Sequence, residues 1–444
     1  MPDVLNVKPD EIDTNEKRSK YTVSVVGCGR IGVVYAYAFA EAGFKVTCSD
    51  ADASVLKKLA KGKTPFMEQE IEGKIKSLIN AGQLSVTSEL KKAVSRSDVI
   101  VIAVPARVDD KKKIDSSKAV NTLKQVGAAL HSGVLVIYGE VAGLGFIEGI
   151  MKETLENTSG LKVGQDFGIA YIPIQNAQVK LVEPMRDLEL KVAVVGKTSQ
   201  DATLNFVKTI TANVKQISDV KTAEIVTLFT AAKQDTNAAL ASELAVFCES
   251  GNIDYFEVLK SLEFNDQSFW PTVVDEENKN EAYLLLESAE NLNVKLRLPT
   301  LARKINEEMV KHAVNLTQDA LRSCNKTLRR ARIAVLGTVI LSTTAPVFLK
   351  LLQSKGAKVS LYDPASKSDA LDLGVVKTSL NEAVEGVDGI VILTRAEQFK
   401  NLNLRKLKAL TKTPSAIVDL ADAFDRKEVE AEGFIYRGLG RGIG

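Results

Sequence analysis

The sequence predicts an α/β protein in which two Rossmann-like, doubly wound domains are joined by a central helical domain. Apolar strand-like runs alternate with helical segments near the start of the chain, and the same alternation returns near its end. Between them lies a long tract with apolar residues at helical spacing and few helix breakers. A chain of 444 residues has room for about two to four domains. We expect a disordered tail at 1–20, the first α/β domain at 21–215, the helical domain at 216–325 and the second α/β domain at 326–444.

Composition places the chain among ordinary globular proteins. Hydrophobic residues make up 45% and charged residues 26%, which excludes collagen-like and wholly disordered chains. The formal charge is +2, so no overall positive field favours nucleic acid. The longest apolar runs, such as 97–104 and 132–138, are far shorter than the roughly 20 residues of a membrane span. We therefore expect a cytoplasmic protein that binds neither nucleic acid nor a membrane.

The cysteines and histidines are too scattered to predict a metal site. The four cysteines form no CxxC pair, and the sequence has only two histidines, His131 and His312. Neither a zinc site nor a disulfide framework is expected. Cys28 and Cys48 lie in apolar strand or turn contexts, which favours small buried hydrophobic residues over reactive thiols.

The first α/β region is expected to begin at Tyr21. Before it, residues 1–20 mix acidic, basic and polar side chains with almost no apolar pattern, which predicts a solvated tail. After it, alternating strands and helices indicate a mainly parallel sheet. The expected strands are 21–26, 45–49, 99–104 and 134–138, and the expected helices are 31–42 and 53–60.

The central and C-terminal regions follow from the same periodicities. Residues 222–249 have apolar side chains at helical spacing, and a second helical tract at 284–312 is expected to be interrupted by Pro299. The second α/β alternation is expected to have strands at 332–337, 358–362, 389–394 and 415–420, and a helix at 345–356. The two end regions resemble distant copies, because each opens with strand, glycine turn and helix and reaches a strand that ends in aspartate, at Asp50 and Asp363.

The first glycine turn predicts a dinucleotide site. The six residues of the turn are Gly27, Cys28, Gly29, Arg30, Ile31 and Gly32. They follow a strand, open a helix and precede Asp50 by about 20 residues, as the fingerprint requires. The helix N-terminus would face the pyrophosphate, and Asp50 would bind the ribose hydroxyls and favour NAD over NADP, although the cations Arg30 and Lys57 lie nearby. The alternative is a glycine turn used only for packing.

The order of further motifs resembles the UDP-glucose/GDP-mannose dehydrogenase family from Tyr21 to Arg441. The similar segments are Val55 to Glu68, Val99 to Pro105, Ala223 to Asp254, Ala302 to Asn306, Val335 to Gly337, Tyr362 to Pro364 and Gly433 to Arg441. The resemblance implies NAD as cofactor, with Val104 and Pro105 beside it, and a nucleotide-sugar substrate. It also implies oxidation of a sugar CH₂OH to a carboxylate with two NAD. Both the resemblance and the long apolar helix predict a homodimer.

The catalytic residues that the resemblance implies are largely missing. The family traps an aldehyde on a thiol in a GGxC-P-x-D loop, whereas residues 269–280 contain neither cysteine nor glycine. The positions of its lysine, asparagine and glutamate read Thr227, Ala231 and Ile174. Pro105-Ala106-Arg107 and Tyr138 to Val141 replace its threonine-bearing turns. On the nucleotide-sugar side, 338–345 lacks the expected cations, and 418–421 lacks an arginine.

The remaining polar residues leave a rebuilt site open. Candidates for a new acid, base or cation are Glu140, Glu224, Lys233, Asp235 and Lys279, although charged residues on helices and loops are usually solvated. The histidines fit surface roles better than proton transfer, and Phe269 and Trp270 fit a packed seam better than base stacking.

Three functions of different classes stay open at this point. The first is an NAD-dependent oxidoreductase acting on a CH–OH group of a sugar nucleotide or related molecule, without ordinary four-electron oxidation. The second is a catalytically inactive NAD-binding paralogue that regulates or assembles with an active homologue. The third is a structural homo-oligomer in which NAD only stabilises the fold.

Overall fold

The computed structural model divides into two compact units, each described separately. Its described residues are 4–64, 69–109, 111–175, 185–262, 269–273, 279–337, 344–363, 374–395 and 397–442. The first unit comprises Met1–Ala232 and Asn280–Lys295, and the second comprises Lys233–Lys279 and Leu296–Gly444. The helical region 216–325 is therefore shared between the units.

The first unit is built on a mainly parallel sheet with the strand order β10-β9-β8-β7-β4-β1-β2-β3. Only the β8–β9 pair in this sheet is antiparallel, within the described residues. The strands are β1 (Thr22–Val26), β2 (Lys45–Ser49), β3 (Leu84–Thr87), β4 (Val99–Ile102), β7 (Leu135–Tyr138), β8 (Gly168–Tyr171), β9 (Leu190–Val194) and β10 (Val214–Gln216). A short antiparallel pair, β5 (Arg107–Val108) and β6 (Ile114–Asp115), follows β4. The doubly wound fold predicted from the alternation is confirmed.

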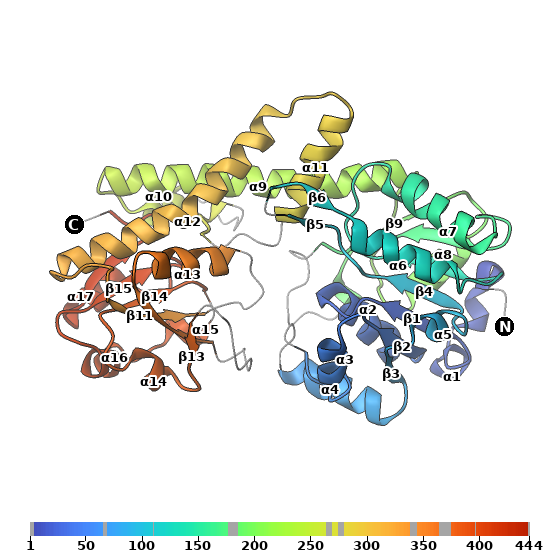
Figure 1. Ribbon diagram of the computed structural model, residues 1–444, viewed down its shortest axis with the longest axis horizontal. Helices are drawn as coiled ribbons and strands as arrows, with labels where there is room; N and C mark the ends of the chain where they lie inside the picture. Colours follow the sequence, from blue (N-terminus) through green and yellow to red (C-terminus); the bar gives the residue numbers. More distant parts are fainter. Residues whose placement is uncertain are drawn as a thin grey trace. The chain divides into compact units, whose positions relative to one another are not determined.

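Helices cover both faces of this sheet (Figure 1). One face carries α2 (Arg30–Glu41), α3 (Ala53–Leu59), α4 (Gln69–Asn80) and α8 (Gln200–Lys208). The other carries α5 (Leu90–Val94), α6 (Ser117–Gly127), η3 (Phe146–Met151) and α7 (Lys152–Ser159). In β4, Val99 and Val101 pack toward the first face, and Ile100 and Ile102 pack toward the second. Because helices cover both faces, every residue of this strand is buried.

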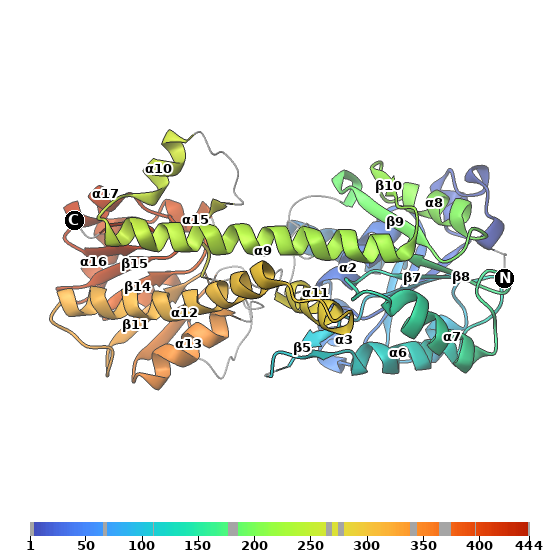
Figure 2. The same cartoon turned by 90° about the horizontal axis from the view of Figure 1, so that it is seen from above.

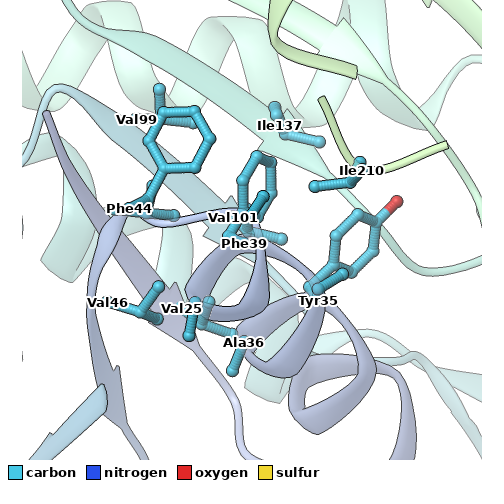
Figure 3. Close-up of a cluster of buried hydrophobic side chains, with 14 of the residues drawn as sticks. Val25, Tyr35, Ala36, Phe39, Phe44, Val46, Val99, Val101, Ile137 and Ile210 are labelled. Carbon is cyan, nitrogen blue, oxygen red and sulfur yellow. The ribbon is translucent and has the colours of Figure 1, made fainter. Parts of the chain in front are cut away.

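The core beneath α2 is aromatic and aliphatic. Figure 3 shows Tyr35, Ala36 and Phe39 of α2 among strand residues such as Val25 and Val101. The Tyr35 hydroxyl donates to the Ile172 carbonyl oxygen, so the ring links α2 to the segment after β8. This core holds the N-terminus of α2 against the sheet.

The N-terminal segment is packed rather than solvated, which corrects the expected tail. Val4, Val7 and Ile12 are buried in the first unit's core, although they lie on short helices, η1 (Val4–Asn6), η2 (Pro9–Glu11) and α1 (Asn15–Arg18), and the links between them. The Val4 N–H donates to the Gly133 carbonyl oxygen at 3.1 Å. Such short irregular turns have no regular apolar period, so the sequence pattern did not reveal them.

The second unit repeats the first one's strand order. Its six parallel strands are arranged β13-β12-β11-β14-β15-β16, which matches β3-β2-β1-β4-β7-β8 position by position. The strands are β11 (Arg332–Leu336), β12 (Lys358–Tyr362), β13 (Val375–Val376), β14 (Gly389–Ile392), β15 (Ala416–Asp419) and β16 (Ile435–Gly438). The prediction that the two end regions are distant copies is therefore confirmed at the level of topology.

Helices again cover both faces of the second sheet. One face carries the later part of α12 (Arg297–Ser323) and α13 (Thr344–Ser354), and the other carries α14 (Leu380–Val384), α16 (Leu404–Leu410) and α17 (Arg426–Ala431). The unit also contains α10 (Tyr255–Ser261) and α15 (Glu397–Lys400).

Figure 2 shows the long helix α9 (Val220–Ser250) and the shorter α11 (Lys279–Asn291). The remaining described element is the short helix η5 (Met185–Asp187) before β9. Pro299 does not interrupt a helix, contrary to our expectation, because α12 begins at Arg297 and Pro299 lies in its first turn. An N–H group there has no partner within the helix, so proline costs nothing. The break between α11 and α12 instead contains Asn293, with φ +57°.

Candidate functional site

The glycine turn between β1 and α2 has the geometry of a phosphate-binding cradle. Gly27 has φ +96°, and a Cβ there would overlap the Ala103 carbonyl oxygen. A Cβ on Gly32 would overlap the carbonyl oxygen of Gly27. Gly29, the N-cap of α2, differs, because a Cβ there would meet nothing within 4 Å. Gly27 and Gly32 are thus needed for packing, and Gly29 faces the open space that a pyrophosphate requires.

Asp50 lies at this turn. Its Oδ2 atom accepts a hydrogen bond from the Cys28 N–H at 2.6 Å, and its Oδ1 atom accepts one from the Asp52 N–H at 2.8 Å. Because β1 and β2 are adjacent parallel strands, the carboxylate at the end of β2 reaches the turn after β1. A hollow of about 40 Å³ lies next to it, lined by Cys28, Val33, Val55, Lys58, Leu59, Lys63 and Thr64.

The other residues predicted for the cofactor site lie around the turn. Ile31 is buried in the core, and Arg30 is half-buried. A hydrogen bond with Cys48, followed by burial, raises the pKa of the Cys28 thiol far above its usual range, so this cysteine stays neutral. Val104 lies against Gly27, and Val104 and Pro105 are half-buried after β4.

The three positions implied as catalytic are buried. Thr227, Ala231 and Ile174 are each at most 1% exposed. The Thr227 hydroxyl donates to the Ala223 carbonyl oxygen at 2.9 Å, within its own helix. Lys233 is exposed.

Two buried carboxyl groups interact electrostatically: Glu140, which lies just after β7, and Glu281, which lies in the first turn of α11. Their residues are 6% and 3% exposed. Gln175 donates from Nε2 to the Glu281 carboxylate at 2.8 Å and to the Thr227 carbonyl oxygen at 3.0 Å. Burial, and then repulsion from Glu281, raises the pKa of Glu140 to about 8, while Arg107 opposes the shift. We call Glu140 and Glu281 the carboxyl pair.

Glu140 was one of the sequence candidates, whereas Glu281 and Gln175 were missed. Helical spacing could have indicated that Glu281 is buried, because Glu281, Leu285 and Ser288 lie on the same, buried face of α11. Gln175 had no such signal, since it lies in the irregular segment after β8.

The other proposed substitutes have structural partners. Glu224 accepts the N–H groups of Gly145 at 2.6 Å and Ile147 at 2.9 Å, and burial raises its pKa to about 6. Asp235 pairs with Arg303 at 2.6 Å in the second unit. The side chain of Lys279 lies outside the described residues.

The histidines and the aromatic pair also contact protein groups. His131 is within 3.0 Å of the Ser97 carbonyl oxygen, and His312 is 2.8 Å from Glu249. Trp270 packs against Phe256 and under the Arg395 guanidinium, 3.6 Å from the ring centre. These contacts favour structural roles.

The second sheet's carboxyl end is described only in part. Gly337, with φ +75°, packs against Thr394, and residues 338–343 after it lie outside the described residues. Asp419 is buried and accepts the N–H groups of Ala421, Ala423 and Phe424. This carboxylate therefore holds the loop after β15.

Neither a metal-ligand cluster nor a membrane-spanning helix occurs among the described residues. Among the ranges given above, no three His, Cys, Asp or Glu side chains gather as a metal site. No described helix is long and apolar enough to cross a membrane.

The fold and the turn together define a nucleotide-binding α/β protein of the dehydrogenase type. Residues 21–215 match the NAD binding domain of the UDP-glucose/GDP-mannose dehydrogenase family, and residues 342–426 match the UDP binding domain of the same family. The chain belongs to this family and carries its NAD-binding domain, as the motifs predicted.

Relatives match the chain over nearly its whole length. It is 29% identical to the UDP-N-acetyl-D-mannosamine dehydrogenase of Pyrococcus horikoshii, over 95% of this chain and 99% of that one. It is 25% identical to the UDP-glucose 6-dehydrogenase of Rhizobium meliloti, over 94% and 99%. The solved structure of the UDP-D-ManNAc dehydrogenase from Pyrococcus horikoshii superposes with a TM-score of 0.80 at 26% identity, covering 95% of this chain and 99% of that chain.

Proposed function

We propose that the protein is an NAD-dependent oxidoreductase that removes one hydride from a CH–OH group of a nucleotide sugar or related molecule. Its two family domains support the cofactor and ligand classes. Its relatives are named for oxidation of UDP-N-acetyl-D-mannosamine and UDP-glucose. The observation that carries the catalytic part is the carboxyl pair. The side chains at the family positions Thr227, Ala231 and Ile174 cannot exchange a proton at neutral pH, whereas the carboxyl pair supplies ionisable groups that can.

The residues around the turn fit NAD. The first-turn N–H groups of α2 would bind the pyrophosphate in the open space at Gly29. Asp50 would accept the ribose hydroxyls, and Val104 and Pro105 would contact the cofactor after β4. Bound NAD would supply the hydride acceptor.

Oxidation is proposed to stop at the carbonyl stage. The family's second step needs a thiolate that traps the aldehyde, and the sequence has no cysteine between Cys248 and Cys324. Burial raises the pKa of both of these thiols, so neither favours the thiolate. Four-electron oxidation of a UDP sugar at family-like rates is therefore not expected.

The stoichiometry of NADH formation tests this proposal. Purified protein, NAD and a panel of UDP- and GDP-sugars should form at most one NADH per sugar and no uronic acid, because the aldehyde has no thiolate to react with. Absorbance and mass spectrometry of the sugar would measure both. Two NADH per sugar, unchanged in the Cys248→Ala and Cys324→Ala variants, would show that the proposed site chemistry is wrong.

The second candidate is an inactive NAD-binding paralogue. It is favoured by Ile174 and Ala231, which put buried apolar groups where the family has a carboxylate and an amide. NAD binding without NADH formation from any sugar of the panel would support this candidate. Such a protein would act by assembling with an active homologue.

We also propose a homodimer formed through α9. Leu240, Leu244 and Phe247 repeat at helical spacing and are 44%, 43% and 70% exposed. An apolar row of this kind favours self-association.

Phe247→Asp should shift the sedimenting mass from dimer toward monomer. Val375→Asp, at a 62% exposed valine on β13, is the matched control and should stay dimeric. A parent that sediments at 48.1 kDa at all concentrations would exclude the dimer.

A further inference from the structure

The backbone at Glu140 is held at the carboxyl edge of the first sheet. Glu140 follows β7 by one residue, Gly139, whose carbonyl oxygen accepts the Ile174 N–H at 3.0 Å. A Cβ on Gly139 would overlap the Tyr35 ring, so the chain here passes close to α2. The position of Glu140 is therefore set by β7, by α2 and by the segment after β8.

The sheet order places this edge in the nicotinamide half of a dinucleotide site. Asp50 directly follows β2, the glycine turn follows β1, and β4 and β7 come next across the sheet. A dinucleotide whose adenosine ribose lies at β2 and whose pyrophosphate lies at β1 extends over the ends of the following strands. Glu140 is then on the side where hydride is exchanged.

The charges around Glu140 come from several elements. Glu281 from α11 raises its pKa, and Arg107 from β5 lowers it. Tyr35 from α2 and Tyr138 from β7 also face it, and burial raises the pKa of both phenols well above the usual value, so both stay neutral. The Val108 N–H donates to the Asn280 side-chain oxygen at 3.3 Å, which joins the Arg107 strand to the start of α11.

We propose that Glu140 is the proton-exchanging carboxyl group of the nicotinamide site. In oxidation, the Glu140 carboxylate accepts the proton of the substrate hydroxyl as the C–H hydride leaves with its electron pair for NAD. The C–O single bond becomes C=O, and the products are a carbonyl compound, NADH and a protonated Glu140. In reduction, the protonated Glu140 returns the proton to the oxygen. Glu281 acts as a positioning residue that sets the pH at which Glu140 changes state.

This inference rests on the proposed function, but proton release on cofactor binding tests the carboxyl group separately from turnover. The nicotinamide ring is cationic in NAD and neutral in NADH, so only NAD favours the carboxylate of a neighbouring glutamic acid. Titration calorimetry in buffers of different ionisation enthalpy should show release of protons with NAD near pH 7.5 and not with NADH. Glu140→Gln should abolish the difference. Glu148→Gln, whose parent side chain is 41% exposed on η3, should keep it.

Two variants make the sign of the effect testable. Glu281→Gln should move the pH at which proton release is largest to lower pH by about one unit, because it removes the like charge beside Glu140. Arg107→Gln should move it to higher pH, because it removes the opposite charge. Glu140→Asp keeps a carboxyl group and should therefore still release protons on NAD binding. This variant keeps the inference testable if Glu140→Gln fails to fold. A merely structural role for the carboxyl pair predicts no opposite shifts.

The turnover result separates the inference from the proposed function. NADH formation in Glu140→Gln should fall on the order of 10²–10⁴-fold with the NAD dissociation constant nearly unchanged. The rise in oxidation rate through about pH 8 should also disappear. Unaffected turnover or unaffected proton release in Glu140→Gln would overturn the inference, whereas the dehydrogenase proposal would then be judged by NADH formation in the parent protein alone. Proton release linked to Glu140 without turnover of any sugar would instead overturn the dehydrogenase proposal.

Discussion

Replacing Gly29 by valine should abolish NAD binding while the protein stays folded. A Cβ at this N-cap position meets nothing within 4 Å, and Gly29 has φ −69°, so the substitution is sterically acceptable to the chain itself. The valine side chain would occupy the space needed for the pyrophosphate and would separate it from the N–H groups of α2. We expect the dissociation constant for NAD to rise on the order of 100-fold or more, since charge-assisted contacts are lost. Calorimetric titration measures this change directly.

The controls for this experiment come from two other glycines. Gly73 on α4 also faces open space, so Gly73→Val should leave NAD affinity unchanged. A Cβ on Gly32 would overlap the Gly27 carbonyl oxygen, so Gly32→Val should lose the fold as well as the cofactor. Circular dichroism separates these two losses. If Gly29→Val bound NAD as the parent does, the turn would not be the cofactor site.

Replacing Asp235 by alanine should strongly destabilise the second unit. Its carboxylate is 2.6 Å from Nη1 of Arg303, and it accepts the Asn306 side-chain amide at 2.8 Å. Both side chains of the ion pair are at most 3% exposed, so removing the carboxylate would delete a buried ion pair and the charge that Nη1 of the buried guanidinium contacts. We expect a loss of about 3–5 kcal/mol, seen as a lower urea midpoint.

A surface pair on the same helix is the matched control. Lys304 and Glu308 are 3.9 Å apart, with side chains 71% and 58% exposed. Glu308→Ala should therefore change stability by about 0–1 kcal/mol. Equal losses of stability in Asp235→Ala and Glu308→Ala would mean that burial does not determine how much an ion pair contributes to stability.

The sequence by itself determined the parts of this protein that depend on neighbouring residues. Strands at 45–49 and 358–362 have the bounds that their apolar runs predicted, and the glycine turn lies between strand and helix as its spacing required. Ordered motifs also predicted the family. These features are local, because strand and helix periods and turn geometry are set by residues close in the chain.

The tertiary structure decided which polar groups meet. Glu281 and Gln175 are 106 residues apart, yet their side chains hydrogen-bond at 2.8 Å beside Glu140. No local period relates an irregular segment after β8 to the first turn of α11, so the pairing follows only from how the sheet and helix pack. Packing against the first unit's core also buries Val4, Val7 and Ile12, whose side chains have no regular period along the chain. A buried carboxyl group also shows its raised pKa only when the groups that exclude water from it are in place, and those come from distant parts of the chain.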